Sequence, residues 1–363
     1  MISLRDATAI HHMPSQLRTD ILHLEWLQLH WPASLRRTPA LMLGLLGGLL
    51  LHQTGAGVLA TAAALSVGLA GLRQIDGSRL ITMLLTTVTM AVCAILGTWS
   101  GNHHVLALAV TIVAGFVVGL LTVLNEDVGW IALQGSIALL VATTFPSHGL
   151  QALLRGVAIL AGGGLQTIIL LVAWRLAGVS RLGDEFQVPG GAAPMPAFYH
   201  ELFRSIGRCL VFTSTSFHFA IHVAITLVIA IELDHQLHLK NGYWLPMTTL
   251  VVLKPDFYRT YSGGIERMIG TLAGVLVASA ITFALHPAGW VLIVLVGVCG
   301  FLSYALLKVN TVLFAGALTS LVVFMIAVSG SSEFVTMEHR LVNTALGCTV
   351  ALASSALIPR RAH

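Results

Sequence analysis

The chain has 363 residues, of which 56% are hydrophobic and only 9% are charged, and its mean hydropathy is +0.88. A soluble domain carries about 25% charged residues, so this chain could not cover a surface that faces water. The composition excludes a soluble enzyme, a nucleic-acid-binding module and a disordered protein. The four cysteines are isolated, without CxxC or Cys/His ligand spacing, and so indicate neither a disulfide framework nor a metal site. We therefore expect an all-α, polytopic membrane protein that needs no cofactor.

The N-terminal segment, residues 1–37, lacks the apolar stretch of a cleavable signal peptide. Its second part has apolar side chains near helical spacing, at Leu17, Ile21, Leu24, Leu27 and Trp31. Charged and polar residues lie between them, which is typical of an amphipathic helix on the cytoplasmic membrane surface. A soluble packing helix fits the same pattern.

A membrane-spanning helix needs about 20 mostly apolar residues. The chain offers twelve such segments, of which the first and the eighth are short. They cover residues 39–52, 56–72, 79–99, 104–124, 128–145, 153–176, 212–232, 243–258, 265–285, 288–306, 309–329 and 339–358. With the N-terminus inside, 16 Lys and Arg residues fall on the inside and 3 on the outside. This asymmetry predicts cytoplasmic termini and an even number of spans.

One long polar stretch, residues 178–211, interrupts the apolar segments and is rich in Pro and Gly at its start. Such a composition marks a linker. The linker divides the chain into a first half, residues 38–177, and a second half, residues 212–363, each with six predicted spans. An even number of spans makes the two halves parallel repeats.

A shorter repeat, R-x-x-x-T-x-x-G, occurs twice within the second half. The first copy comprises Arg267, Thr271 and Gly274, and the second comprises Arg340, Thr344 and Gly347. Three predicted spans lie within the 73 residues between the copies, so the two three-span units are expected to be inverted. Nested inverted and parallel repeats are typical of secondary transporters. Packing between helices, with each arginine anchored at the interface, explains the same residues.

Residues 242–274 read GYWLPMTTLVVLKPDFYRTYSGGIERMIGTLAG. This segment resembles the integral-membrane module of the fusaric-acid-resistance-like and aromatic acid exporter superfamily. The matching positions are Gly242, Tyr243, Trp244, Pro246, Thr248, Val252, Leu253, Pro255, Arg267, Gly270, Thr271 and Gly274. The resemblance implies an inner-membrane exporter of aromatic or other weak organic acids, with a periplasmic adaptor protein as an outer partner. Plant organic-anion channels of the malate type are similar in the same module.

The eighth segment carries the first candidate for substrate binding. From Tyr243 to Lys254 is eleven residues, about 17 Å of helix, whereas the hydrocarbon core is about 30 Å thick. Tyr243 and Trp244 are expected in the outer aromatic belt, which places Lys254 near mid-membrane, directly before helix-breaking Pro255. A cation at that depth predicts a binding site for a carboxylate. Further candidates for substrate-binding residues are Tyr243, Trp244, Arg267 and Arg340. Alternatively, the helix continues to Tyr258 and Lys254 snorkels inward.

The seventh segment carries a candidate proton pathway. His218 and His222 are four residues apart, so they share one face of a helix, and Glu232 closes the same segment. Ionisable groups in hydrocarbon are costly, which favours a path for protons from the outside towards Lys254. Core histidines hydrogen-bonded to the backbone are the alternative.

These observations predict a proton-coupled exporter of small organic anions. A passive organic-anion channel on the same fold and a non-transporting membrane subunit of an efflux assembly are the alternatives. An enzyme is not expected, because no paired carboxylates or nucleophile–base spacing accompany the histidines. No GxxxxGK[ST] loop for ATP occurs in the sequence. The expected partners are the bilayer and the anion, and an oligomer is compatible with the sequence.

Overall fold

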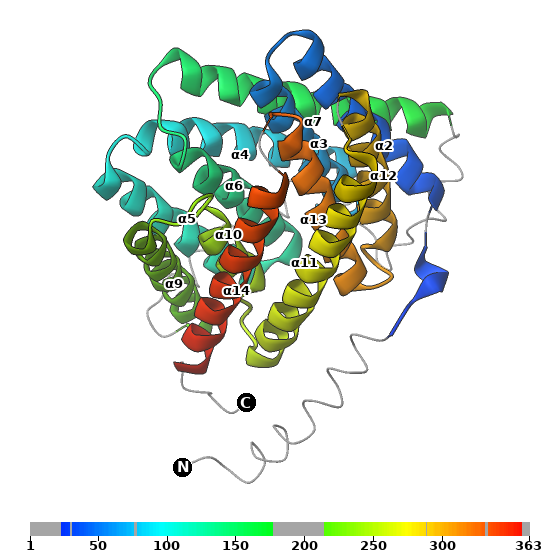
Figure 1. The fold of residues 1–363 in the computed structure, drawn as a ribbon. Helices are drawn as coiled ribbons and strands as arrows, with labels where there is room; N and C mark the ends of the chain where they lie inside the picture. The colour runs from blue at the N-terminus through cyan, green and yellow to red at the C-terminus, as the bar shows by residue number, and fades with distance from the viewer. Residues whose placement is uncertain are drawn as a thin grey trace.

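The computed structural model describes residues 23–29, 31–75, 78–176, 214–287, 289–330 and 333–357. These residues form twelve α-helices and one short 3-10 helix, η1 (Trp26–Gln28), without a β-strand among them (Figure 1). The predicted all-α class is therefore confirmed. Most of the predicted amphipathic N-terminal helix and the whole of the 178–211 linker lie outside the described residues.

Each predicted apolar segment contains one helix. The first half holds α2 (Trp31–Leu50), α3 (Thr54–Ala70), α4 (Arg79–Ser100), α5 (His104–Leu124), α6 (Glu126–Thr143) and α7 (Leu150–Leu176). The second half holds α9 (Thr215–Leu237), α10 (Trp244–Val252), α11 (Phe257–Leu285), α12 (Trp290–Leu306), α13 (Thr311–Ala327) and α14 (Glu333–Leu357).

Several of the predicted boundaries are wrong, the clearest being those of the first and the eighth segment. Helix α2 begins at Trp31 rather than near residue 39, because Arg36 and Arg37 continue the helix instead of preceding it. The eighth segment breaks early: α10 ends at Val252, and Asp256 then caps α11 by accepting a 2.9 Å hydrogen bond from the Arg259 N–H. The continuation of this helix to Tyr258, one of the two alternatives, therefore does not occur.

Six of the described helices are long and apolar enough to cross a membrane: α4, α5, α7, α9, α11 and the part of α14 from Thr336 to Leu357. Helices α3, α12 and α13 are apolar but shorter. Helix α10 has nine residues, about 14 Å, which is well below the thickness of a hydrocarbon core. These lengths support a multi-pass membrane protein, and the number of twelve spans stays a prediction.

The helices of the two halves pack in corresponding pairs. In the first half α4 packs on α6 and α7, and α3 packs on α7; in the second half α11 packs on α13 and α14, and α10 packs on α14. The halves meet chiefly where α5 packs on α9 and where α2 packs on α12. Gly115 and Gly119 of α5 allow a close approach to Ala224 and Ala220 of α9, because any side chain there would meet their backbone.

Several local contacts recur 185 positions apart. Asn125 caps α6 and Asn310 caps α13, and each side chain accepts hydrogen bonds from the backbone N–H groups two and three residues later. A second recurrence involves two glycines that contact backbone carbonyls: Gly162 against Ala60 and Gly347 against Leu245. Corresponding residues thus hold corresponding places in the two halves.

Candidate functional site

The two R-x-x-x-T-x-x-G elements lie on helices that cross in opposite directions. Near one end of the crossing, the Cys348 thiol of α14 donates a 3.5 Å hydrogen bond to the Gly264 carbonyl of α11. Near the other end, the Ser279 hydroxyl of α11 donates a 3.0 Å hydrogen bond to the Met337 sulfur of α14. The motif residues of both helices lie between these two contacts, with α11 and α14 side by side (Figure 1).

The charges of the arginines of the two elements act on each other across the crossing. Arg340 is only 2% exposed, and Arg267 is close enough for the two positive charges to repel each other. Neither guanidinium forms a salt bridge within the described residues. The sequence offered two explanations for these arginines, substrate binding and anchorage at the start of a span. Neither residue opens its helix: Arg267 lies ten positions after the first residue of α11 and Arg340 seven after that of α14, and Arg340 is enclosed by protein.

Unpaired polar atoms gather around this crossing. In the described part of the chain, the Nε atoms of Arg267 and Arg340 and the hydroxyls of Thr248 and Thr271 are buried without a hydrogen-bond partner. Guanidinium groups can only donate, and hydroxyls can donate as well. Buried polar groups are usually satisfied. These atoms are therefore available to donate hydrogen bonds to an acceptor with negative charge.

Aromatic rings adjoin the same arginine. Trp244 begins α10 and Tyr243 precedes it, and their ring centroids are 5.3 Å apart. The guanidinium carbon of Arg340 lies 5.0 Å from the centroid of the Trp244 ring, within reach of a cation–π interaction. We expected both rings in an outer aromatic belt, but they are 8% and 2% exposed and pack inside the protein, where Arg340 stacks on Trp244.

The row of aromatic rings continues into the first half. The centroid of Phe145, just after α6, lies 6.1 Å from that of Tyr243. On the far side of Phe145, the guanidinium carbon of Arg155 on α7 lies 6.0 Å from the ring centroid, and Arg155 donates hydrogen bonds to the Thr98 hydroxyl and the Phe145 carbonyl. Arg155 stands 185 positions before Arg340, so corresponding cations terminate the row at both ends. Phe145 was not among the predicted site residues, because it lies almost 100 residues before Tyr243.

The glycine, threonine and proline residues predicted to have structural roles lie where helices contact each other. A side chain at Gly270 would come within 2.6 Å of the Val312 carbonyl, and Gly274 directly contacts the Gly316 carbonyl, so α11 and α13 touch through backbone. At Gly347, a side chain would come within 2.7 Å of the Leu245 carbonyl. Thr344 is buried, and Pro246 is buried within the first turn of α10, where proline is tolerated.

Lys254 lies apart from the two arginines, in the link between α10 and α11. Its backbone N–H donates a 2.9 Å hydrogen bond to the Thr260 hydroxyl, which in turn contacts the Lys254 carbonyl at 3.2 Å. The charges that act on its ammonium group are Glu126, Arg73 and Arg259. Both halves thus contribute to its surroundings, but Lys254 is not an isolated cation. Its predicted role as the principal anion ligand stays a prediction.

The candidate proton pathway is not assembled as one group. His218 is exposed and hydrogen-bonds the Ser214 carbonyl at 2.9 Å, as in the alternative of a histidine tied to the backbone. The His222 ring lies near the backbone of Ser354, but neither ring nitrogen makes a hydrogen bond of ordinary geometry within the described residues. Glu232 is ten residues further along α9, about 15 Å away, and so does not contact either histidine.

Glu232 pairs instead with a histidine of the first half. His104 Nε2 and Glu232 Oε1 are 2.9 Å apart, and they connect the start of α5 to the end of α9. His235 lies beside this pair, with its ring centroid 4.7 Å from that of His104. The 128 residues between His104 and Glu232 left no local pattern by which the pair could be predicted.

The comparison with family models agrees with the resemblance seen in the sequence. Residues 217–354 match the family model described as "Fusaric acid resistance protein-like". A protein of Neisseria gonorrhoeae described as "Uncharacterized protein ORF2" is 28% identical over 144 residues, which cover 38% of this chain and 33% of the relative. The match thus spans about a third of the relative's length. No solved structure matches the chain.

The family match covers α10, α11, α12 and α13 completely, together with nearly all of α9 and α14, and so includes both crossing elements and Trp244. Together with the long apolar helices, it supports a role in membrane transport or efflux. The resemblance of the second half is confirmed over this range, because residues 217–354 match the fusaric acid resistance protein-like family model.

Proposed function

We propose that this chain is an inner-membrane secondary exporter of small aromatic or other weak organic acids, with both termini in the cytoplasm. The observation that carries the proposal is the pair of buried guanidinium groups, Arg267 and Arg340, with no acidic partner among the described residues. Burying two cations without an acidic partner is unfavourable. This cost is offset when a carboxylate binds to the guanidinium groups and accepts hydrogen bonds from them.

The aromatic part of the substrate class is supported by the rings next to Arg340. Trp244 and Tyr243 offer a buried apolar surface directly beside the cations. A planar acid that reaches Arg340 with its carboxylate would lay its ring along these side chains, because offset and edge-to-face aromatic pairs add about 0.5–1.5 kcal/mol beyond area burial. An aliphatic acid would keep the charge interaction and lose the ring contacts.

The arrangement of α11 and α14 supports a substrate site that opens alternately to the two sides of the membrane. The two arginine-bearing elements run in opposite directions, as expected of inverted units, and each arginine approaches the crossing from its own end of the helix pair. In transporters with such repeats, the substrate site lies at the repeat interface near the midplane. We infer that two six-helix repeats related by 185 positions form the transport unit, and the corresponding helix pairs of the two halves support this.

Proton coupling is the second part of the proposal, and the ion pair between His104 and Glu232 supports it. The pair joins the two halves, and its side chains are 44% and 39% exposed, so protons have access to it. Histidine is the side chain suited to change charge near neutral pH. Replacing either side chain would remove this contact between α5 and α9. The alternative is a passive anion channel. The two cations, without acidic partners in the described chain, would attract an anion in a channel as well as in an exporter.

The test uses the full chain in proteoliposomes loaded with benzoate, with and without an imposed proton gradient. We expect uphill benzoate transport that follows the proton gradient, a loss of at least ten-fold in Arg340→Met, and unchanged transport in Arg175→Met, which removes an exposed arginine. If benzoate flux responds to voltage but not to the proton gradient, the chain is a passive channel instead. Transport at the wild-type rate by Arg340→Met would contradict the proposed substrate site. Lys254→Met in parallel separates the two candidate cation sites, and a larger loss there than in Arg340→Met would return the site to the α10–α11 link.

A further inference from the structure

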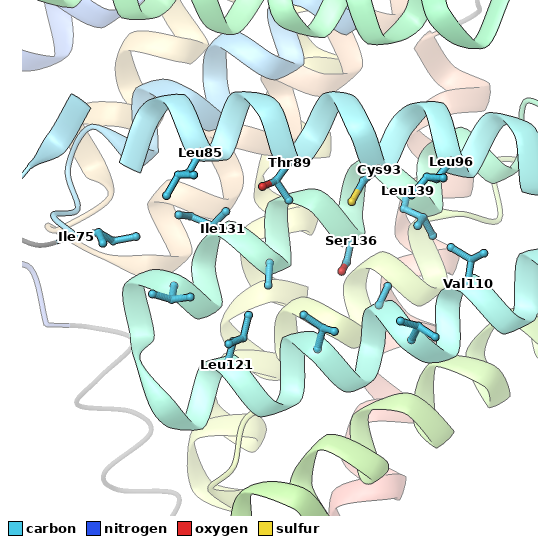
Figure 2. A pocket seen from close by; sticks show the side chains of 15 residues that line it. Ile75, Leu85, Thr89, Cys93, Leu96, Val110, Leu121, Ile131, Ser136 and Leu139 are labelled. Atoms are coloured by element: carbon cyan, nitrogen blue, oxygen red, sulfur yellow. The ribbon is translucent and has the colours of Figure 1, made fainter. Parts of the chain in front are cut away.

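A cavity of about 350 Å³ lies in the first half, between α4, α5 and α6 (Figure 2). It is distinct from the arginine site and contains none of the predicted site residues. Helices α4 and α5 each pack closely on α6 but touch each other only slightly, which leaves a groove with α6 as its floor. Figure 2 shows the side chains of all three helices pointing into the same space.

The groove is long and narrow in the direction of its helices. Its lining on α4 runs from Leu85 to Leu96, and its lining on α5 runs from Val110 to Leu121. Each run covers eleven steps along its helix, about 17 Å. At one end Leu85 faces Leu121, and at the other Leu96 is near Val110 (Figure 2). Both helices are long and apolar enough to span a membrane.

The chemistry of the lining is almost entirely hydrocarbon. Of the side chains that line the groove, only Thr89, Cys93 and Ser136 carry a hydroxyl or a thiol, and none is charged. A carboxylate would find no cation there and would lose its hydration without compensation. The groove therefore does not suit the anion of the proposed transport function.

The rim of the groove opens towards the surface that faces lipid. Val113 is 62% exposed and Leu96 is 43% exposed, although both line the groove. Since these residues belong to apolar helices of spanning length, the medium at the rim is hydrocarbon rather than water. An occupant must enter sideways from the bilayer, and the most abundant elongated apolar molecule there is a lipid acyl chain.

Two positions of α6 at the groove carry smaller side chains than their counterparts in the second half. The residues 185 positions after Ser136 and Leu139 are Leu321 and Phe324, which are larger and fully buried. The second half therefore accommodates a larger side chain at each of these two positions. We propose that the groove binds one acyl chain of a membrane phospholipid.

The full chain is reconstituted in vesicles of phosphatidylethanolamine and phosphatidylglycerol that contain a phospholipid with a diazirine in its acyl chain. After illumination, adducts are mapped by mass spectrometry at the groove residues Val113 and Val117. The comparison is with Leu276 and Val277 on the outer surface of α11, which are 61% and 53% exposed. We expect at least three-fold more adducts in the groove. Equal yields would overturn the proposal.

A variant pair then assigns the excess adducts to the void. Ser136→Leu adopts the residue of the second half and should reduce the groove adducts to the level of Leu276, whereas Ser136→Ala should leave them unchanged. An excess that persists in a folded Ser136→Leu protein would contradict the proposal. If Ser136→Leu does not fold, the wild-type ratio alone decides. Benzoate is added as a competitor, and a loss of groove adducts would show that the acid, not a lipid, is the occupant. None of these outcomes depends on whether the chain transports benzoate.

Discussion

The hydroxyl of Thr249 on α10 donates a hydrogen bond of 3.1 Å to the carbonyl of Gly347 on α14. The other helix of the crossing pair has an equivalent, since the Ser320 hydroxyl on α13 donates one of 2.9 Å to the Gly274 carbonyl on α11. Gly274 and Gly347 hold the same place in the two R-x-x-x-T-x-x-G elements. A hydroxyl from a neighbouring helix thus binds each element at the same point, which supports an inverted relation between the units.

These two hydrogen bonds predict similar and additive losses of stability. Removing either hydroxyl, in Thr249→Val or in Ser320→Ala, should cost about 0.5–1.5 kcal/mol. The bonds have no partner in common, so the double variant should lose the sum of the two single losses. Thermal or denaturant unfolding in detergent measures all three variants. A loss in one variant only would show that the two contacts are not equivalent.

The glycine contacts between α3 and α7 predict opposite effects of two neighbouring substitutions. In Gly162→Ala the new methyl group would collide with the Ala60 carbonyl, so the helices must separate. Overpacking of this kind typically costs about 1–3 kcal/mol. In Gly164→Ala the methyl group meets nothing within 4 Å, and the variant should gain up to about 1 kcal/mol from helix propensity. Unfolding experiments compare both with wild type; equal effects would refute the close approach.

The stacking of Arg340 on Trp244 predicts a change in substrate preference. Trp244→Leu keeps an apolar side chain but removes the ring that faces the guanidinium. Transport of benzoate should fall several-fold relative to transport of an aliphatic acid such as butyrate, measured side by side in proteoliposomes. Trp244→Phe should retain most of the preference, because a ring remains. An equal decline for both acids in Trp244→Leu would indicate that Trp244 supports only the fold.

The ion pair between His104 and Glu232 predicts a defect in coupling rather than in folding. Both side chains are more than a third exposed, and such pairs contribute about 0–1 kcal/mol to stability. His104→Gln and Glu232→Gln should therefore unfold close to the wild-type temperature. Their benzoate transport should respond less to an imposed proton gradient, while downhill exchange persists. If both variants keep the full response, the proton acts elsewhere, and His222 is the next residue to test.

The sequence was sufficient for the helices, because their signal is local. Apolar stretches between charged or Gly-containing turns placed one helix in each predicted segment, and the composition placed the chain in a membrane. The motif around Arg267 and Arg340 was visible for the same reason: identical residues recur at identical spacing. Some helix boundaries were predicted wrongly because a helix can continue through charged residues. Arg36 and Arg37 lie within α2, although charged residues commonly flank a membrane span.

The site was only partly predictable, because burial depends on which helices meet. Lys254 appeared to be an isolated cation along the chain, whereas folding brings Glu126, Arg73 and Arg259 near it. Arg340 appeared to open its helix, yet its neighbours α10 and α11 bury it beside Trp244. Glu232 was placed with His222 because they share a helix, but its partner comes from α5. Each of these differences is a contact between segments far apart in sequence.

The correspondence over 185 positions has a consequence for stoichiometry. Arg340 has a counterpart in Arg155, but the position that corresponds to Arg267 is Thr82, a buried residue without charge. Arg155 also differs from Arg340 in that a hydroxyl and a backbone carbonyl accept its hydrogen bonds. The described chain therefore holds this combination of two arginines at the crossing of α11 and α14, but not at the corresponding crossing of α4 and α7. A titration with benzoate should saturate at one equivalent per polypeptide, despite the duplicated framework.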